Sequence, residues 1–380
     1  MFSCGGEASY AMRWLSNISC MTRGLVTPGK YALVSLLAVL AVPAPAAVVV
    51  LYHHVSDKTP ASTSISPARF EAQMDYLAEA GFTVVPLMTL VETLRKGGTL
   101  PDKTLAITFD DSYASVYESA YPLLKKRGWP FTFFVNTEAV GSSRLFVSWD
   151  QLREMATQGV TIANHTNAHH HLPRKQPGES AREFRQRIEQ EISRAQQKIA
   201  QEIGEAPMIL AYPFGEYDRE VQAIAKKLGY VAFGQQSGVL SEHGDLQAVP
   251  RFPFGGSFTE LDDFKLKVNS LPMPIASTAF YANKQQRLDD LVVKAGDQPW
   301  LVLTLEEPRL LKAVNCFATG QGAIPVEIIR DQLWTRAKAP LNAGRARYNC
   351  TAPAGGKGRF YWYTQQWLVT DKNGNWSHND

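Results

Sequence analysis

The sequence predicts an α/β fold in which buried parallel strands alternate with helices, followed by a smaller strand-rich domain. Two observations support this prediction. Short apolar runs alternate with amphipathic segments that have capping residues and glycine stops, which is typical of a parallel sheet covered by helices. After residue 274 this alternation ends, and aromatic, β-prone runs replace it, separated by loops rich in Gly, Pro and Asn.

The predicted elements follow one another in a regular order. A buried-strand pattern opens the series at 47–51, and Ser66 with Pro67 then begins a helix that Gly81 ends. A short extended segment at 84–85 and a helix over 86–96 come next. Further strands are predicted at 104–109, 131–135, 160–163, 208–210 and 230–233, and helices at 116–124, 148–155, 179–203 and 218–228.

Three regions result from this pattern. We expect a leader over 1–47, an α/β domain over 48–274 and a β-rich domain over 275–380 with the character of a β-sandwich. The last region contains the aromatic run 359–369. Alternating aromatic side chains are more typical of a sandwich core than of a glycan-binding surface, and both interpretations stay open.

Composition and charge narrow the class of protein. The chain has 380 residues, of which 39 are basic and 36 acidic, so the formal net charge is only +3. A net charge this small does not indicate the excess of basic residues that nucleic-acid-binding proteins use, so we expect no nucleic-acid partner. The composition excludes wholesale disorder and coiled coil, and it leaves the oligomeric state unknown.

The N-terminal region has the features of an export signal. The apolar run 31–42 follows basic residues and precedes the small-residue triplet 44–46. It is too short to span a bilayer, which takes about 20 residues. We therefore expect cleavage near Ala46 or Ala47, export to the periplasm or the cell exterior, and no transmembrane helix after signal removal. An uncleaved anchor is the alternative, and translation from Met21 is a second hypothesis.

The four cysteines divide between two regions. Two of them lie in the predicted leader, and Cys316 and Cys350 lie in the β-rich domain. Because an exported protein folds in an oxidising compartment, we predict a disulfide between Cys316 and Cys350.

Side chains suited to metal binding follow two of the predicted strands. Asp110 and Asp111 follow one strand, and His165 and His169 follow another. The carboxyl ends of parallel strands meet at one rim, so these side chains are expected to converge. One Asp with two His is the ligand set of a catalytic divalent metal, with zinc as the first choice and cobalt, nickel or iron as alternatives. A helix-cap pair and a solvated histidine loop are the alternative interpretations.

Two further motifs lie at strand ends. The segment Tyr212, Pro213, Phe214 and Gly215 has a rigid aromatic character that suits a sugar ring, although a plain turn is the alternative. The pair of histidines at 53–54 follows the first strand and is expected near the same rim, where a structural role is the alternative.

These motifs resemble those of the polysaccharide deacetylase family with the NodB homology domain, carbohydrate esterase family 4, and most of all its poly-N-acetylglucosamine deacetylase branch. The resemblance covers about residues 51–254 and is most specific in the second of its motifs. The matching motifs are TFDD at 108–111, HTNAHHHL at 165–172, YPFG at 212–215 and YHHV at 52–55.

The resemblance implies a distorted, incomplete (β/α) barrel of the NodB type. It also implies a metal-dependent enzyme that removes N-acetyl groups from an N-acetylglucosamine-containing polysaccharide substrate and releases acetate. An O-acetyl glycan esterase of the xylan type and a polysaccharide-binding protein that has lost catalysis are the alternatives.

Roles for single residues follow from the same resemblance. Asp110 is expected to be the general base, with Asp111, His165 and His169 as metal ligands. The family's late Leu-x-His motif, which supplies the general acid, is not apparent, and His53 is expected in that role.

The chain departs from the family pattern at two further positions. Ser112 stands where the family usually has Gly, and Ala211 stands where it usually has an Arg that orients the base. We take Arg251 as the replacement for that Arg. Arg251 is also expected, with Tyr212, Pro213 and Phe214, among the residues that bind substrate.

Overall fold

A parallel sheet forms the centre of the fold in the computed structural model, which describes residues 47–355 and 358–376. Residues 1–46 of the predicted leader and the hypothetical start at Met21 lie outside these residues, whereas Ala47, the last residue of the predicted leader, is the first residue of β1. The strand order is β10-β1-β5-β6-β7-β8-β9, and β4 pairs with the beginning of β5. The strands are β1 (Ala47–Tyr52), β4 (Thr83–Val84), β5 (Thr104–Phe109), β6 (Thr132–Val135), β7 (Thr161–Asn164), β8 (Ile209–Ala211), β9 (Val231–Phe233) and β10 (Phe252–Pro253). A small separate pair consists of β2 (His54–Val55) and β3 (Ser64–Ile65).

The sheet curls until its two ends are joined by one segment of chain. Val249 forms an isolated parallel bridge with Phe233 in β9, and three residues further on β10 pairs with β1. The contact with β9 is a single bridge rather than a full strand ladder. The result is a distorted, incompletely closed barrel, which confirms the predicted α/β class.

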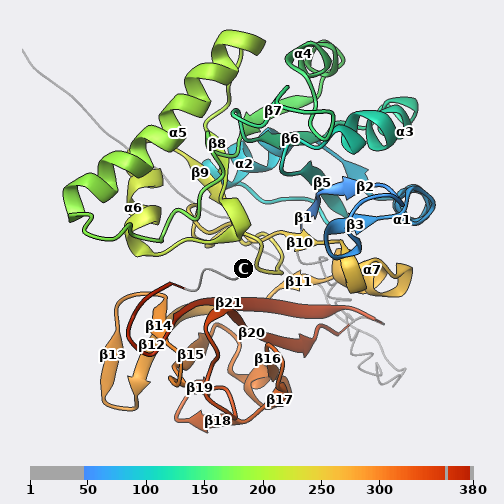
Figure 1. The fold of residues 1–380 in the computed structure, drawn as a ribbon. Helices are drawn as coiled ribbons and strands as arrows, with labels where there is room; N and C mark the ends of the chain where they lie inside the picture. Colours follow the sequence, from blue (N-terminus) through green and yellow to red (C-terminus); the bar gives the residue numbers. More distant parts are fainter. Residues whose placement is uncertain (1–46, 356–357, 377–380) are drawn as a thin grey trace, which may run out of the picture. The chain divides into compact units, whose positions relative to one another are not determined.

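Most of the helices lie on the outside of this curled sheet (Figure 1). The Ser66 side chain begins its helix as the sequence predicts and accepts a hydrogen bond from the Arg69 amide. Ser148 and Ser180 form capping boxes at the starts of two further helices. The helix predicted over 116–124 begins instead as a π-helical turn, Val116–Ala120. The α-helices are α1 (Pro67–Glu79), α2 (Leu87–Arg95), α3 (Tyr121–Lys126), α4 (Trp149–Thr157), α5 (Ala181–Ile203), α6 (Arg219–Lys227) and α7 (Leu261–Val268).

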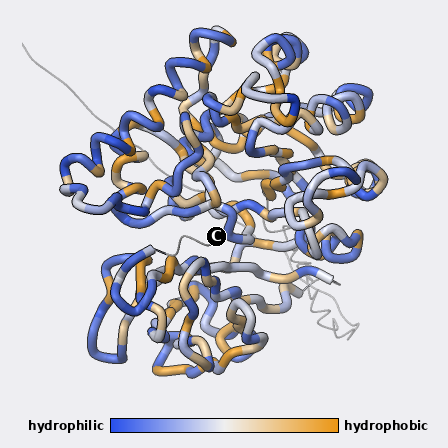
Figure 2. The backbone as a smooth tube through the Cα atoms, viewed as in Figure 1, coloured by the Kyte–Doolittle hydropathy of each residue, from blue (hydrophilic) through white to orange (hydrophobic). Residues whose placement is uncertain are grey.

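Alternate residues of the strands pack into two different apolar clusters. In β1, Val48 and Val50 pack in a cluster with α1, α3 and α4, whereas Ala47 and Val49 pack with apolar side chains of the other strands, such as Phe134. Residues of α2, such as Leu90, belong to this second, inner cluster. The barrel is therefore a packed core, and the apolar segments gather along its strands (Figure 2).

The strand-rich region after the barrel forms two sheets. One has the order β11-β21-β20-β16-β17 with β14 beside β21, and the other has the order β13-β12-β15-β19-β18. Their strands are β11 (Leu271–Pro272), β12 (Ile275–Asn283), β13 (Gln286–Leu288), β14 (Val292–Lys294), β15 (Trp300–Leu305), β16 (Asn315–Ala318), β17 (Gly322–Ile324), β18 (Val326–Ile329), β19 (Gln332–Thr335), β20 (Gly344–Pro353) and β21 (Phe360–Thr370). The domain boundary at 274/275 stays a prediction, since β11 already pairs with β21.

The aromatic run of β21 divides between core and partly buried positions. Trp367 is fully buried and packs against Phe280 and Tyr348, as a sandwich core requires. Tyr361 and Trp362 are only partly buried against the apolar cluster of the barrel. The core interpretation therefore holds for Trp367, and the glycan-binding interpretation stays a hypothesis for the others.

The predicted disulfide is present in this region. Cys316 in β16 and Cys350 in β20 lie opposite each other and are bonded across a separation of 34 residues. In the loop-entropy model a crosslink of this span stabilises the fold by about 4 kcal/mol. None of the helices within 47–355 and 358–376 is long and apolar enough to cross a bilayer.

Candidate active site

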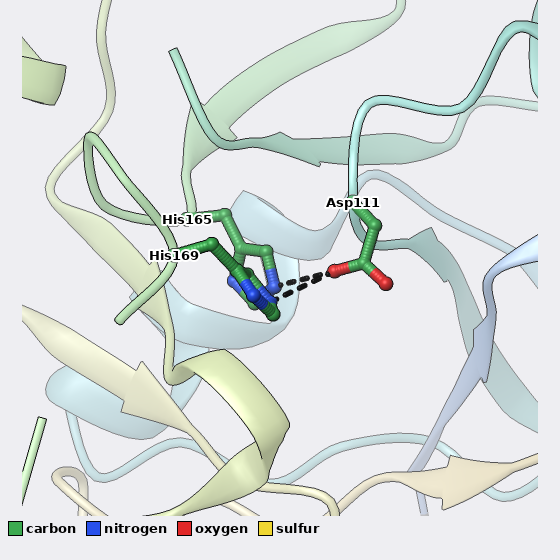
Figure 3. A group of neighbouring side chains, drawn as sticks. All are labelled: Asp111, His165 and His169. Atoms are coloured by element: carbon green, nitrogen blue, oxygen red, sulfur yellow. Dashed lines mark hydrogen bonds and ion pairs between the residues drawn. The ribbon is translucent and has the colours of Figure 1, made fainter. Parts of the chain in front are cut away.

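Asp111, His165 and His169 converge at one rim of the barrel (Figure 3). The Nε2 atoms of His165 and His169 lie 3.0 and 3.1 Å from Asp111 Oδ1. Asp111 follows β5 and the two histidines follow β7, so the strand-end placement predicted from sequence brings them together. The potential ligand atoms of this metal-ligand cluster lie within 4.8 Å of one another.

The backbone at this rim is held in an uncommon conformation. Among the described residues, seven non-glycine residues have positive φ, and five of them lie here: Asp111, Ser112, Thr166, His169 and Phe214. Strain of this kind persists only where surrounding contacts over-determine the conformation, and it gathers at functional sites.

The conformation of Ser112 explains why glycine is usual at its position. Its φ of +60° lies in the left-handed region that glycine adopts without strain. Here the serine hydroxyl donates a 2.7 Å hydrogen bond to Asn136 Oδ1 and accepts one from the Asn136 amide. These bonds hold the turn after the two aspartates, so the departure from glycine leaves the position of Asp111 intact.

A backbone carbonyl orients the His165 ring. His165 Nδ1 lies 2.8 Å from the Ala211 carbonyl oxygen, which accepts a hydrogen bond from the protonated nitrogen. The other nitrogen, Nε2, is thereby left as the atom that faces Asp111.

Electrostatics favour a charged carboxylate in the cluster. Burial acts to raise the pKa of Asp111, but the nearby rings of His165 and His169 outweigh it and hold that pKa well below its usual range. An ionised Asp111 is the form that binds a cation.

The residues present fit a divalent metal. His169 Nε2 is buried and makes no hydrogen bond, although it faces Asp111. A buried nitrogen without a hydrogen bond is costly unless another group satisfies it. One carboxylate and two imidazoles form the N/O donor set that zinc and its neighbours in the first transition series accept.

Asp110 lies beside this cluster and is paired with Arg251. Arg251 Nη1 and Nη2 donate to the two carboxylate oxygens at 2.8 and 2.7 Å, and both side chains are inaccessible to solvent. Arg251 Nε also donates to the Gly234 carbonyl oxygen. The expectation that Arg251 contacts substrate is therefore wrong, because the side chain is buried beneath the rim, where it orients Asp110.

The paired charge predicts a large stability effect. Arg251→Met is expected to lower the free energy of unfolding by about 3–5 kcal/mol near neutral pH, because it leaves the Asp110 carboxylate buried without a partner. Arg251→Lys restores a charge but not the two-point contact, so we expect partial recovery.

Chemical denaturation at pH 7 measures this effect, with Arg309→Met as the control because Arg309 is largely exposed. A variant Arg251→Met as stable as the parent protein would contradict the assignment.

The two histidines after β1 have different surroundings. His53 Nε2 lies 3.9 Å from Asp111 Oδ2 and 3.5 Å from Gln235 Nε2, so His53 faces the metal-ligand cluster. His54 is buried, stacks on Tyr113 at 3.5 Å and makes a 3.2 Å hydrogen bond with Ser115. Of the two, only His53 is placed to act at the rim.

His54 predicts a pH dependence of stability. Burial, followed by the nearby charge of His53, lowers the pKa of His54 to about 4, while Asp111 acts in the opposite direction. The unfolded chain, with a pKa of about 6.5, binds more protons between pH 4 and 6.5. The stability contributed by neutral His54 is therefore complete above about pH 6.5 and is lost as the pH falls towards 4.

We expect His54→Gln to reduce the loss of unfolding free energy between pH 7 and pH 4.5 by about 2 kcal/mol. Denaturation of metal-free parent and variant at both pH values measures the difference. Equal losses in the two proteins would show that His54 does not titrate in this way.

The motif at 212–215 supplies one accessible aromatic side chain. Tyr212 is fully buried, and its hydroxyl donates to the Gln247 carbonyl oxygen, while Pro213 is buried as well. Their expected contact with substrate is therefore wrong, because both side chains are directed into the fold. Phe214 is partly exposed, and its ring lies 4.6 Å from that of His169.

Several residues at the rim carried no recognisable sequence signal. Gln235 follows β9 and reaches His53, and Glu216 accepts a 2.8 Å hydrogen bond from His171. The one sequence feature that marks them is their position in loops that follow strands, and many other residues share it.

Known proteins share sequence and fold with the part of the chain that carries this site. Residues 97–233 match the model of the polysaccharide deacetylase family. The chain is 27% identical over 253 residues to the poly-beta-1,6-N-acetyl-D-glucosamine N-deacetylase of Escherichia coli strain K12. This match covers 57% of this chain and 38% of that protein. It is also 27% identical over 186 residues to the protein of the same name from Staphylococcus aureus strain MRSA252, covering 47% of this chain and 63% of that one.

A solved structure, IcaB from Ammonifex degensii, has the same fold. The match has a TM-score of 0.51 at 27% identity and covers 58% of this chain and 96% of that one. The chain thus spans less than two thirds of the two curated relatives and nearly all of this structural neighbour. The match to the polysaccharide deacetylase family model, over residues 97–233, includes the segments that carry Asp111, His165 and His169.

Proposed function

We propose that this protein is a metal-dependent hydrolase that removes N-acetyl groups from an N-acetylglucosamine-containing polysaccharide and releases acetate. The observation that carries the proposal is the position of the Arg251-paired Asp110 beside the metal-ligand cluster of Asp111, His165 and His169. The names of the relatives from Escherichia coli and Staphylococcus aureus support N-acetylglucosamine polymers as the substrate class.

The cluster residues would hold the cation, for which zinc is the first choice. When bound, a divalent metal supplies Lewis acidity, which polarises a carbonyl oxygen and makes water more acidic. The deep burial of His165 and its hydrogen bond to the Ala211 carbonyl oxygen keep the ligand set in place between turnovers.

Asp110 acts as the general base in this proposal. Its carboxylate accepts the proton of the water that attacks the acetamide carbon. Arg251 engages both oxygens, yet each carboxylate oxygen has a further lone pair that remains available as an acceptor. The two-point contact fixes the direction of those lone pairs. A backbone N–H near Tyr113 is proposed to stabilise the oxyanion.

His53 acts as the general acid and protonates the leaving amine. Its Nε2 lies 3.9 Å from Asp111 Oδ2, the carboxylate oxygen that His165 does not approach, and its side chain is partly exposed at the rim. Phe214 offers an apolar face to the substrate beside His169.

His53→Ala is expected to lower kcat for an amide substrate by roughly 10²-fold, the lower end of the range for general acid–base catalysis. An activated ester, whose leaving group needs no protonation, should lose much less. Measurements of kcat for parent and variant on both substrates compare the loss on the amide with the loss on the ester. A kcat near the parent value on the amide would exclude His53 as the acid.

We further propose that the protein is exported and acts in the periplasm or outside the cell. The Cys316–Cys350 disulfide supports this location, because such bonds persist in oxidising compartments. The export signal predicted before Ala47 is the second support.

Acetate release from three glycans tests the proposed activity. A β-1,6-linked N-acetylglucosamine oligomer, O-acetylated xylan and fully deacetylated oligomer are compared, with free amine measured beside acetate. Equal amounts of acetate and amine from the first are expected. Acetate from xylan alone would favour the esterase, and binding of the oligomer without any acetate would favour a polysaccharide-binding protein.

A further inference from the structure

One buried carboxylate connects three distant segments of the chain. Glu216, directly after the Tyr212–Gly215 motif, is 1% exposed, and it accepts hydrogen bonds from His171 at 2.8 Å and Arg174 at 3.2 Å. The Nε atom of Arg345 lies 3.8 Å from the same carboxylate. Arg345 belongs to β20 in the strand-rich region, far from the barrel motifs in sequence.

Arg345 also holds the main chain at Phe214. Its Nη1 donates a 2.7 Å hydrogen bond to the Phe214 carbonyl oxygen across a separation of 131 residues. Phe214 has a φ of +59°, a left-handed conformation that bulky side chains rarely adopt. Outside contacts must maintain such a conformation, and a charge-assisted bond to its own carbonyl is a strong one.

The Phe214 ring is held as firmly as its backbone. It stacks on His171 at 3.6 Å with an interplanar angle of 7°, and its centroid lies 4.6 Å from that of His169. The His171 ring is in turn fixed by Glu216. Arg345 therefore acts on the backbone of a residue whose side chain contacts a member of the metal-ligand cluster.

We infer that Arg345 is a positioning residue of the active site, through which strand β20 holds the Phe214 turn in its strained conformation against His169. Through this contact, the strand-rich region helps to shape the side of the active site that Phe214 forms beside His169. This inference rests on the proposed deacetylase function for its activity readout.

The alternative is a contact that only joins two parts of the fold. Such a contact would change stability without changing the geometry at Phe214. The two roles differ in their effect on kinetics. A displaced Phe214 turn lowers kcat, the turnover rate of bound substrate, even when the stability of the fold is unchanged.

The kinetic test uses Arg345→Met, which keeps the length of the side chain and removes its donors, and Arg345→Lys, which restores one donor and the charge. We expect Arg345→Met to lower kcat/KM roughly tenfold, mainly through kcat, with recovery to within about threefold in Arg345→Lys. Arg309→Met is the control, since Arg309 is an exposed residue of the same region that pairs only locally with Glu307.

A double-mutant cycle with Phe214→Ala tests whether the effect passes through Phe214. If Arg345 acts by holding this turn, Arg345→Met should have little further effect on kcat/KM once the Phe214 ring is absent. Additive effects of the two substitutions, or parent kcat/KM in Arg345→Met, would overturn the inference.

A spectroscopic readout separates this inference from the proposed function. The ¹⁹F NMR spectrum of the full chain with 4-fluorophenylalanine at position 214 should show one sharp resonance, which shifts or divides in Arg345→Met and not in Arg309→Met. An unchanged resonance would overturn the inference even if Arg345→Met folds poorly enough to complicate kinetics. Absence of acetate release by the parent protein would instead reject the proposed function.

Discussion

Asp110→Asn is expected to lower acetate release by roughly 10²–10⁴-fold, the contribution that a positioned general base makes. The amide has nearly the shape of the carboxylate but cannot accept the proton of the attacking water. The metal-ligand cluster does not include Asp110, so metal affinity should remain within a few-fold of the parent value. Steady-state kinetics, with metal content measured on the same samples, test this expectation.

Controls are needed because Asn leaves Arg251 without its anionic partner. Unfolding measurements at the assay temperature will show whether Asp110→Asn remains folded. Asp75→Asn serves as the matched variant, since Asp75 is an exposed carboxylate that also pairs with an arginine, Arg127. Parent-level turnover by folded, metal-loaded Asp110→Asn would remove Asp110 from the mechanism.

His165→Ala is expected to weaken zinc affinity by roughly 10²-fold or more, beyond the 10–100-fold that is typical when a group hydrogen-bonded to a metal ligand is lost. Activity should disappear in step with the metal. His165 is fully buried and faces Asp111 at 3.0 Å, so no solvent-exposed group can readily take its place.

The neighbouring histidine offers a matched control. His170 belongs to the same motif, but its side chain is 61% exposed and its nearest acidic partner is Glu191 at 3.9 Å. Calorimetric titration of zinc into chelator-treated proteins should therefore separate His165→Ala from His170→Ala. Equal affinities in these two variants would contradict the ligand assignment.

The sequence was sufficient to predict the strands and the rim, because both depend on local signals. Each barrel strand is a short apolar run, and the polar residues directly after such runs are brought together by the geometry of any parallel barrel. This is why the sequence places Asp111, His165 and His169 at one rim, where the structure has their potential ligand atoms within 4.8 Å of one another.

Contacts between distant segments were not predictable in the same way. For Arg251 the family resemblance suggested that it orients the base, but substrate contact was expected as well, and the structure buries it against Asp110, 141 residues earlier in the chain. An arginine in a buried pair and an arginine at a surface have the same local sequence pattern. The Phe214–Arg345 contact had no signal, since periodicity within β20 predicts a strand but not what its side chains reach.

The motif at Tyr212 shows a different limit of sequence reasoning. Aromatic and proline residues at a strand end suit a substrate wall and a packed turn equally well. The structure assigns Tyr212 and Pro213 to the interior and leaves Phe214 at the rim. The positive φ of Phe214 decides which way this turn faces, and no sequence pattern around it specifies that angle.

The dependence of acetate release on bound metal tests the central claim most directly. Protein freed of metal by a chelator is titrated with zinc, and acetate from the N-acetylglucosamine oligomer is measured at each ratio. The proposed site predicts no release without metal and a linear rise that ends at one equivalent. Full release from chelator-treated protein, or a rise that is unchanged in His165→Ala, would contradict it.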